Sequence, residues 1–257
     1  VMHMDRLWFP VRRCHRDDTL GVWPCETLAA GPAPQPPRPA STSFSKSEDP
    51  RVARLLPSLV MINYDMPFSI SGVTERNYHG TGLVVDAGRG WVVTDRNTVP
   101  VAVGDVRLTF AGTLEVPARV VYVHPLHNLA LIAYDPALVG KTPVASARLG
   151  TRPMSAGDEV WTVGLRADET VASRRTEITS IDPVQYGLSF QFRDTNLETA
   201  SLVNPPDDYD GVPADRSGPV VGLWSSFATY ASWHMEGGKG VLPKVVKFQM
   251  RPNPLAK

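Results

Sequence analysis

Short runs of apolar residues, separated by glycine, proline and acidic turn residues, dominate the chain from about residue 55 onward. Runs of this length with such boundaries are typical of β-strands, and almost no stretch follows the helical period. In the first half of this region they predict strands over 59–66, 80–88, 90–95, 105–112, 117–125 and 128–136. In the second half they predict strands over 158–165, 172–182, 188–196, 218–227 and 240–243.

The two clusters of strands predict an all-β domain over residues 55–245. We expect two packed six-stranded antiparallel β-barrels, the first over 55–140 and the second over 150–245, with residues 246–257 as a C-terminal tail. Two barrels that pack side by side leave a cleft between them, which is a natural place for a site.

The segment before the strands differs in composition. Residues 31–54 begin with "GPAPQPPRPASTSFSKSEDP" and contain few large apolar groups, so they predict an extended linker between an N-terminal tail of residues 1–30 and the β domain. The tail holds both cysteines, Cys14 and Cys25. Two free thiols are the favoured interpretation, and a disulfide is the alternative.

Charge and motif content narrow the class of function. The chain has 26 Lys and Arg against 26 Asp and Glu, without the basic excess that a nucleic-acid-binding protein usually carries. No apolar run approaches the roughly 18 residues that a membrane span needs. His124 and His127 have the spacing of a metal pair, but Pro125 interrupts them and no third ligand cluster follows, so we expect no metal or other cofactor.

Five pieces in a fixed order resemble the trypsin-like domain of HtrA/Deg-type serine proteases over about residues 58–245. They read "GTGLVVDAGRGWVVTD", "HPLHNLALIAYDP", "GDEVWTVGL", "VVGLWSSF" and "GVLP". Three further pieces, "DRNTV", "HPLHNLALIAYDP" and "RDTNLE", are similar to the second, degenerate protease-like unit of large members from fungi and plants that carry two such units. Residues 1–30 then resemble the end of a PDZ-like region. The resemblance implies a chymotrypsin-like fold, a Ser-His-Asp triad, trimer formation, and a location in the nucleus or an organelle.

The residues at two of the three triad positions differ from those of the family. The family histidine follows a strand, and the matching stretch from Thr94 to Val99 places Asn97 there. A carboxamide has no nitrogen basic enough to accept the proton of a nucleophile. The family aspartate begins a D-x-A-L pattern, which here is Asn128-Leu129-Ala130-Leu131. A change from aspartate to asparagine at that position lowers turnover on the order of 10⁴-fold by itself.

The nucleophile position depends on the register of the alignment. "DRSGPVVG" suggests Ser217, but counting back from "VVGLW" makes Asp215–Gly218 a hairpin turn and places Tyr209 at the serine position. The matching oxyanion loop consists of Asp207, Asp208, Asp210 and Gly211. A carboxylate about 4 Å from the developing oxyanion costs on the order of 4 kcal/mol, as much as one oxyanion-hole donor contributes. These acids could instead bind calcium, although a solvated acidic loop is the favoured interpretation.

The sequence therefore predicts a catalytically inactive protease-like domain that serves as a protein-binding or scaffolding module. Its partners would be proteins or peptides, in a homotrimer or a larger complex, and not nucleic acid. One alternative is an active serine endopeptidase in which Ser217 works with a base outside the family pattern, such as His79. The other is a structural subunit of a larger assembly.

Overall fold

The computed structural model describes residues 12–14, 25–27, 37–66, 77–125, 129–183, 198–204, 206, 209–225 and 246–248. The chain divides into two units, Val1–Pro37 and Arg38–Lys257. In the first unit, strands β1 (Arg12–Cys14) and β2 (Cys25–Thr27) pair antiparallel, with Cys14 opposite Cys25. The side chains of both cysteines lie outside the described part of the chain, so the choice between free thiols and a disulfide stays a prediction.

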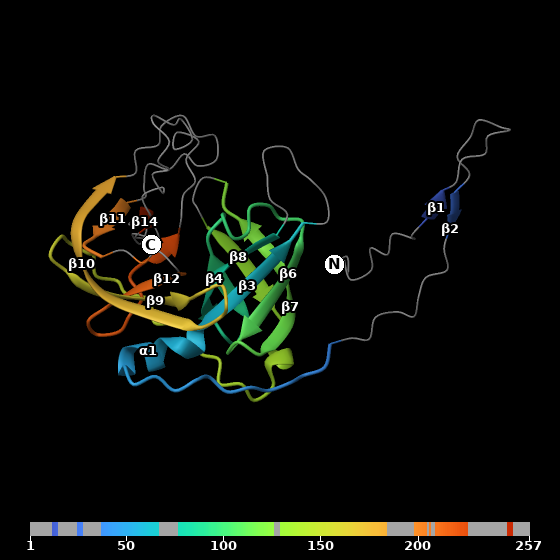
Figure 1. The fold of residues 1–257 in the computed structure, drawn as a ribbon, viewed down its shortest axis with the longest axis horizontal. Coiled ribbons are helices and arrows are strands. Elements are labelled where there is room, and N and C mark those ends of the chain that lie inside the picture. The colour runs from blue at the N-terminus through green and yellow to red at the C-terminus, as the bar shows by residue number, and fades with distance from the viewer. Residues whose placement is uncertain are drawn as a thin grey trace, which may run out of the picture. The chain divides into compact units, whose positions relative to one another are not determined.

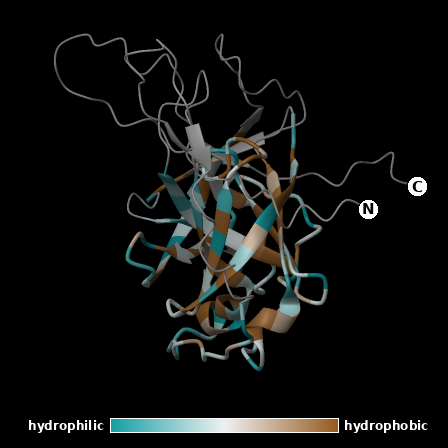
Figure 2. Cartoon of the chain, turned by 90° about the vertical axis from the view of Figure 1, so that its right-hand side faces the viewer, coloured by the Kyte–Doolittle hydropathy of each residue, from teal (hydrophilic) through white to brown (hydrophobic). Residues whose placement is uncertain are grey.

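The first half of the second unit is a closed antiparallel barrel in the order β3-β4-β5-β8-β7-β6 (Figure 1). Its strands are β3 (Leu59–Asp65), β4 (Asn77–Asp86), β5 (Trp91–Thr94), β6 (Asp105–Phe110), β7 (Leu114–Val123) and β8 (Ala130–Tyr134). Along the start of β7, buried Leu114 and Val116 alternate with exposed Glu115 and Pro117. Successive side chains of a strand point to opposite faces, so this alternation places one face in the barrel core. Figure 2 shows the same mixture of apolar and polar segments along the barrel strands. The barrel predicted from the sequence is confirmed.

The second half is a six-stranded antiparallel sheet in the order β11-β10-β9-β12-β13-β14. Its strands are β9 (Glu159–Leu165), β10 (Val171–Pro183), β11 (Glu198–Leu202), β12 (Asp210–Asp215), β13 (Leu223–Ser225) and β14 (Val246–Phe248). The edge strands β11 and β14 contact each other, although no hydrogen-bonded ladder is described between them. The all-β prediction is thus confirmed, with one closed barrel and a second sheet of the expected strand number.

Four elements differ from the expected ones. β11, β12 and β14 were not among the predicted strands, and β14 lies in the expected C-terminal tail. A short α-helix, α1 (Pro50–Leu55), lies in the expected linker. The strands predicted over 188–196 and 240–243 fall outside the described residues.

Residues 38–49, called the strap below, lie against the barrel instead of linking two separate parts. The Ala40 N–H donates to the Leu138 carbonyl in the 3-10 helix η2 (Pro136–Val139), at 3.1 Å. The Ser41 Oγ accepts from the Lys141 N–H at 2.8 Å. Phe44 packs against both the barrel core and the core shared with the second sheet. The compact unit therefore begins at Arg38, whereas we expected it at about residue 55.

The helix α1 follows the strap and covers the end of the second sheet (Figure 1). Asp49 caps it by accepting the Arg51 N–H at 2.8 Å, and Pro50 occupies its first turn, where no amide hydrogen is needed. A 3-10 turn, η1 (Leu56–Ser58), joins it to β3. The apolar face of α1 packs on both halves of the domain, in a cluster comprising Val52, Leu55, Leu56, Leu59, Leu83, Trp161, Val163, Val212, Ala214 and Val220. None of the helices in the described ranges is long and apolar enough to cross a membrane.

Candidate active site

The position predicted for the family's histidine, Asn97, lies in a closed turn after β5. The Asp95 Oδ1 accepts the Thr98 N–H at 2.7 Å, and the Asp95 carbonyl accepts the Val99 N–H at 3.2 Å. Aspartate at the first position of a turn satisfies backbone donors in this way, which explains why the polar stretch folds back after the strand. Asn97 lies within the turn, and its buried Nδ2 atom makes no hydrogen bond within the described part of the chain.

The position predicted for the family's aspartate falls between two described stretches of the chain. Asn128 and His127 lie outside the described residues. On either side of them, the His124 N–H donates to the Leu129 carbonyl at 2.8 Å, and β8 begins at Ala130. His124 itself contacts the ring of Tyr122, with the centroids 5.6 Å apart. No group of three metal-ligating side chains occurs within the described ranges.

Tyr209, at the aligned serine position, is buried with only 8% of its surface exposed. Its hydroxyl lies 2.7 Å from the Thr162 Oγ1 and 3.3 Å from the Thr162 carbonyl. Because the Thr162 hydroxyl donates to the Arg174 carbonyl at 3.1 Å, it is free to accept the proton of the tyrosine. The phenol is thus directed into the second sheet, where Thr162 of β9 holds its oxygen.

The loop around Tyr209 leads into β12, and the backbones of β9 and β12 approach closely there. Asp207 and Asp208 lie outside the described residues. Gly211 pairs with Gly164 of β9, and a Cβ on Gly164 would lie only 1.8 Å from the Asp210 carbonyl. Only glycine fits this crossing, since real Cβ atoms do not approach a carbonyl oxygen so closely.

A threonine hydroxyl joins the barrel to the second sheet at the same point. The Thr81 Oγ1 on β4 donates to the Asp210 carbonyl at 2.7 Å and accepts the Leu165 N–H at 3.1 Å. The Thr94 Oγ1 in turn donates to the Thr81 carbonyl at 3.2 Å. These bonds connect the strand before the Asn97 turn with the strand that follows Tyr209.

Two carboxyl groups in this region have perturbed protonation. Burial first, and then the nearby charge of Asp210, raise the pKa of Asp95 to about 7, although the backbone N–H donors of its turn oppose the shift. Burial also raises the pKa of Asp210, and His79 on β4 lowers it. The sequence singled out Asp210 as part of its acidic loop, but it did not single out Asp95. Nothing in the local sequence "TDRN" shows that the charge of Asp210, far along the chain, acts on Asp95.

Ser217 lies elsewhere, in an exposed turn after β12. Its hydroxyl donates to the Asp215 Oδ1 at 2.7 Å, and the Gly218 N–H donates to the Asp215 carbonyl at 3.0 Å. Gly218 has a φ of 107°, which explains the glycine at this corner. The Ser217 carbonyl accepts the Arg54 Nη1 of α1 at 3.3 Å. The contacts described for this serine thus involve Asp215 and Arg54, whereas His79 acts on Asp210.

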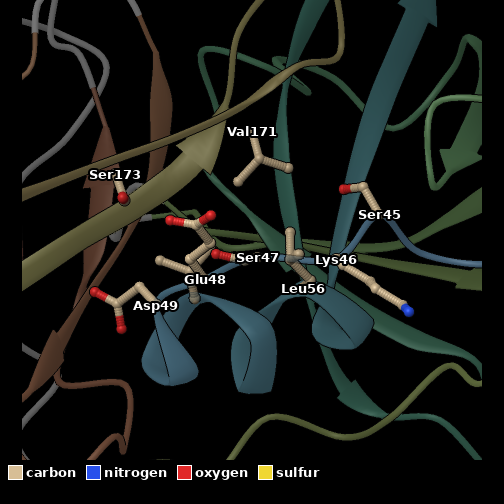
Figure 3. Close-up of a pocket in the computed structure, with 9 residues that line it drawn as sticks. Ser45, Lys46, Ser47, Glu48, Asp49, Leu56, Val171 and Ser173 are labelled. Carbon is tan, nitrogen blue, oxygen red and sulfur yellow. The ribbon is translucent and has the colours of Figure 1, made fainter.

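A hollow of about 470 Å³ lies between the strap, α1 and β10 (Figure 3). Polar strap residues such as Lys46 and Glu48 line it, together with Val171 and Ser173 of β10. None of the predicted site residues borders this hollow.

The closed barrel, the second sheet and a site region where the two meet define the chain as a trypsin-like protease domain by fold. No family model matches the chain. It is 30% identical over its whole length to a PDZ domain-containing protein of Schizosaccharomyces pombe, and 31% identical over 88% of its length to Pro-apoptotic serine protease nma111 of Aspergillus fumigatus. It spans only 29% and 23% of those two proteins.

Solved structures with the same fold are similar to most of the chain. One is an HtrA-type protease, AlgW with tripeptide, which superposes with a TM-score of 0.54 at 17% sequence identity. The match covers 78% of this chain and 58% of the AlgW chain. Another is the active form of the Rv3671c protease of Mycobacterium tuberculosis, with a TM-score of 0.57 at 19% sequence identity. The match covers 87% of this chain and 89% of the Rv3671c chain. The chain thus has the fold of HtrA-type trypsin-like proteases, and in sequence it is similar to one segment of a much longer pro-apoptotic serine protease.

Proposed function

We propose that this chain is a trypsin-like domain without proteolytic activity that acts as a protein-binding or scaffolding module. The burial of Tyr209 carries this proposal. A nucleophile must present its oxygen to a substrate carbonyl and lose its proton to a base. Here the residue at that position directs its oxygen into the second sheet, towards Thr162.

The surroundings of Tyr209 support the same conclusion. A phenol has a pKa near 10 and needs a strong base to react at neutral pH. Asn97 at the base position supplies an amide, which cannot act as that base. Asp210 follows Tyr209 directly, in the loop that we predict to match the oxyanion loop, where an active member gathers hydrogen-bond donors.

Ser217 is the alternative nucleophile, and its geometry argues against that role. Its hydroxyl proton is directed at Asp215, a neighbour in the same turn. A turn serine held by an aspartate two residues away is a common local motif that needs no catalytic explanation. The turn also connects β12 to the chain leading to β13, so its conformation follows from the hairpin.

An active-site probe tests the proposal. We expect the purified chain to remain unlabelled by a fluorophosphonate probe under conditions that fully label an active trypsin-like protease in the same gel. Ser217→Ala should give the same result as the unmodified chain. Covalent labelling that disappears in Ser217→Ala would show an active protease and would overturn the proposal.

The exposed part of β7 supports the binding role. The ladder with β6 ends at Ala118, while β7 continues to Val123 along β8 alone. Val121 and Tyr122 in this extension are 42% and 47% exposed. Such a strand edge suits an extended segment of a protein partner, which would add backbone hydrogen bonds and cover the apolar side chains.

The relatives are several times longer than this chain, which matches only 29% and 23% of their length. We propose that proteolysis by a longer protein of this type resides outside the segment that matches this chain. Formation of a trimer or of a larger complex is part of the same proposal. Size-exclusion chromatography with light scattering on the purified chain measures it directly, and a monomer at micromolar concentration would refute self-assembly.

A further inference from the structure

The outer face of the barrel is apolar over three neighbouring strands, β5, β8 and β7. Successive side chains of a strand alternate between two faces, and the inward row of Val92, Ile132 and Val120 packs in the barrel core. A sheet face that meets water normally carries polar side chains instead. The two outward rows on either side of this inward row carry mostly apolar ones, which requires an explanation.

The strand pairing defines this surface, which we call the platform. It consists of Trp91, Ala133 and Arg119 in the first row and of Val93, Leu131 and Tyr122 in the second. Neighbouring strands lie about 4.8 Å apart, and alternate residues of a strand lie about 7 Å apart. The platform therefore measures about 10 Å across its three strands and about 7 Å along them.

An irregularity in β7 adds one more apolar side chain to the platform. The pairing of β7 with β8 shifts between Val120 and Tyr122, so Val121 is an extra residue in the ladder. A bulge of this kind redirects the side chains beside it. Val121 and Tyr122 are both exposed, to 42% and 47%. Two large apolar groups thus lie next to each other in contact with water.

The platform continues an apolar face that is buried elsewhere in the molecule. Leu83 of β4 pairs with Val93 and belongs to the core between the barrel and the second sheet. Along this row the exposed fraction rises from 2% at Leu83 and 9% at Val93 to 47% at Tyr122. β7 lies on the side of the barrel away from the second sheet (Figure 1). No side chain of the platform belongs to an apolar core formed by the described residues, and such a surface marks an interaction site.

Cations border the platform at both ends of its strands. Arg119 is exposed, and its guanidinium forms no ion pair with a carboxylate of the described ranges. At the other end of the first row, the Arg89 guanidinium lies 5.0 Å from the ring centroid of Trp91. Beyond the second row, the Arg96 Nη1 donates to the His124 carbonyl at 3.2 Å.

The carboxylates near the first row are already engaged. Asp86 on β4 accepts the Arg89 N–H at 2.9 Å and lies 3.7 Å from its guanidinium. Asp135, directly after β8, accepts the Ala137 N–H at 2.9 Å. The platform itself contains no acidic residue. Its border is therefore positively charged, and Arg119 is the cation best placed to meet a carboxylate of a partner.

We propose that the platform binds an amphipathic helix of a partner protein, with carboxylates beside the apolar stripe of that helix. Two turns of a helix, about 11 Å long, match the extent of the platform. The backbones of β5 and β8 are paired on both sides in the closed barrel, so the platform offers side chains and not a free strand edge. Tryptophan, tyrosine and arginine are the residue types that most often anchor protein interfaces. This inference rests on the proposed function and names the chemistry of the partner.

Fluorescence anisotropy with two synthetic peptides tests the proposal on the whole chain. Each labelled peptide has about 18 residues, enough to hold a helix, with leucines on one face. One carries glutamates beside the leucines, and the other carries lysines at the same positions. We expect the chain to bind the glutamate peptide only. Tyr122→Thr should weaken this binding at least about tenfold. Arg119→Glu should weaken it about tenfold and allow binding of the lysine peptide.

Matched controls change the same residue types at other exposed positions. Val203→Thr removes an apolar side chain that is 54% exposed, and Arg148→Glu reverses an exposed charge. Both should leave the affinity for the glutamate peptide unchanged. Threonine at position 122 preserves a residue type that strands favour, and urea denaturation verifies that each variant is folded.

Three outcomes would overturn the proposal. The first is a monomeric chain that does not bind the glutamate peptide at about 1 mM, the weak limit of specific affinity. The second is binding that neither Tyr122→Thr nor Arg119→Glu weakens, because the peptide would then lie elsewhere. The third is a dimer in light scattering that Tyr122→Thr dissociates, since a second copy of the chain would then cover the platform.

The peptide assay and the fluorophosphonate assay fail independently. A chain that binds the glutamate peptide but is labelled at Ser217 would refute the proposed loss of proteolytic activity and retain the platform. An unlabelled chain that does not bind the peptide would refute the platform alone.

Discussion

The bond between Tyr209 and Thr162 is the feature of the site whose strength can be measured most directly. The two hydroxyl oxygens lie 2.7 Å apart, and both side chains are buried. Tyr209→Phe removes the bond and preserves the ring, so we expect a loss of about 1 kcal/mol in the free energy of unfolding. The loss stays small because the Thr162 hydroxyl keeps its bond to the Arg174 carbonyl.

Tyr209→Ser tests the burial of the ring itself. Replacing a buried aromatic side chain with a small one costs about 3–5 kcal/mol through lost transfer free energy and the cavity left behind. This is a large part of the roughly 5–15 kcal/mol by which a domain is stable. Restoring the serine of an active family member should therefore destabilise the chain severely without creating a protease, because Asn97 supplies no base.

Urea denaturation monitored by tryptophan fluorescence provides the free energies of a double-mutant cycle. The cycle combines Tyr209→Phe with Thr162→Val, and we expect a coupling energy of about 1 kcal/mol. An equal m-value in all four proteins would show that the denatured state is unchanged. Additive losses, or a Tyr209→Ser variant as stable as the parent, would refute the placement of the phenol in the second sheet.

Two further substitutions test the contacts that set the position of the site. Gly164→Ala would place a Cβ 1.8 Å from the Asp210 carbonyl, so the same denaturation assay should show a loss of at least about 3 kcal/mol, whereas Gly88→Ala, with only a 3.5 Å contact, should change little. Arg51→Ala removes a guanidinium that lies 4.0 Å from the ring centroid of Trp161, with an expected cost of about 0.5–1 kcal/mol at this half-exposed position; an unchanged midpoint would show that α1 docks through its apolar face alone.

The strands of the barrel were predictable because their signal is local. Alternation along residues 114–117 and compact apolar runs such as 91–94 mark β-structure directly. The turn at Asp215–Gly218 was also predictable, because a short polar residue followed by glycine is a local turn signal. The helix α1 had a signal that composition concealed: Asp49 and Pro50 form a capping sequence, and Val52, Leu55 and Leu56 follow at helical spacing.

The strap and the protonation of Asp95 could not be read from the sequence. Proline and serine predict an extended segment, but not that Ser41 bonds the backbone of Lys141 across the fold. The environment of Asp95 likewise depends on a residue far along the chain, Asp210. Burial and charge proximity are properties of tertiary packing, so local propensity carries no trace of them.

The contacts that join the barrel to the second sheet do not depend on catalytic side chains. Thr81 joins the two halves through backbone partners, the Asp210 carbonyl and the Leu165 N–H. Gly164 and Gly211 bring β9 and β12 together because both lack a side chain. Phe44 and α1 pack against residues of both halves. Since none of these groups transfers a proton or attacks a substrate, the junction between the two halves can keep its form whatever residues occupy the triad positions. This separation of shape from chemistry is what a binding module derived from a protease requires.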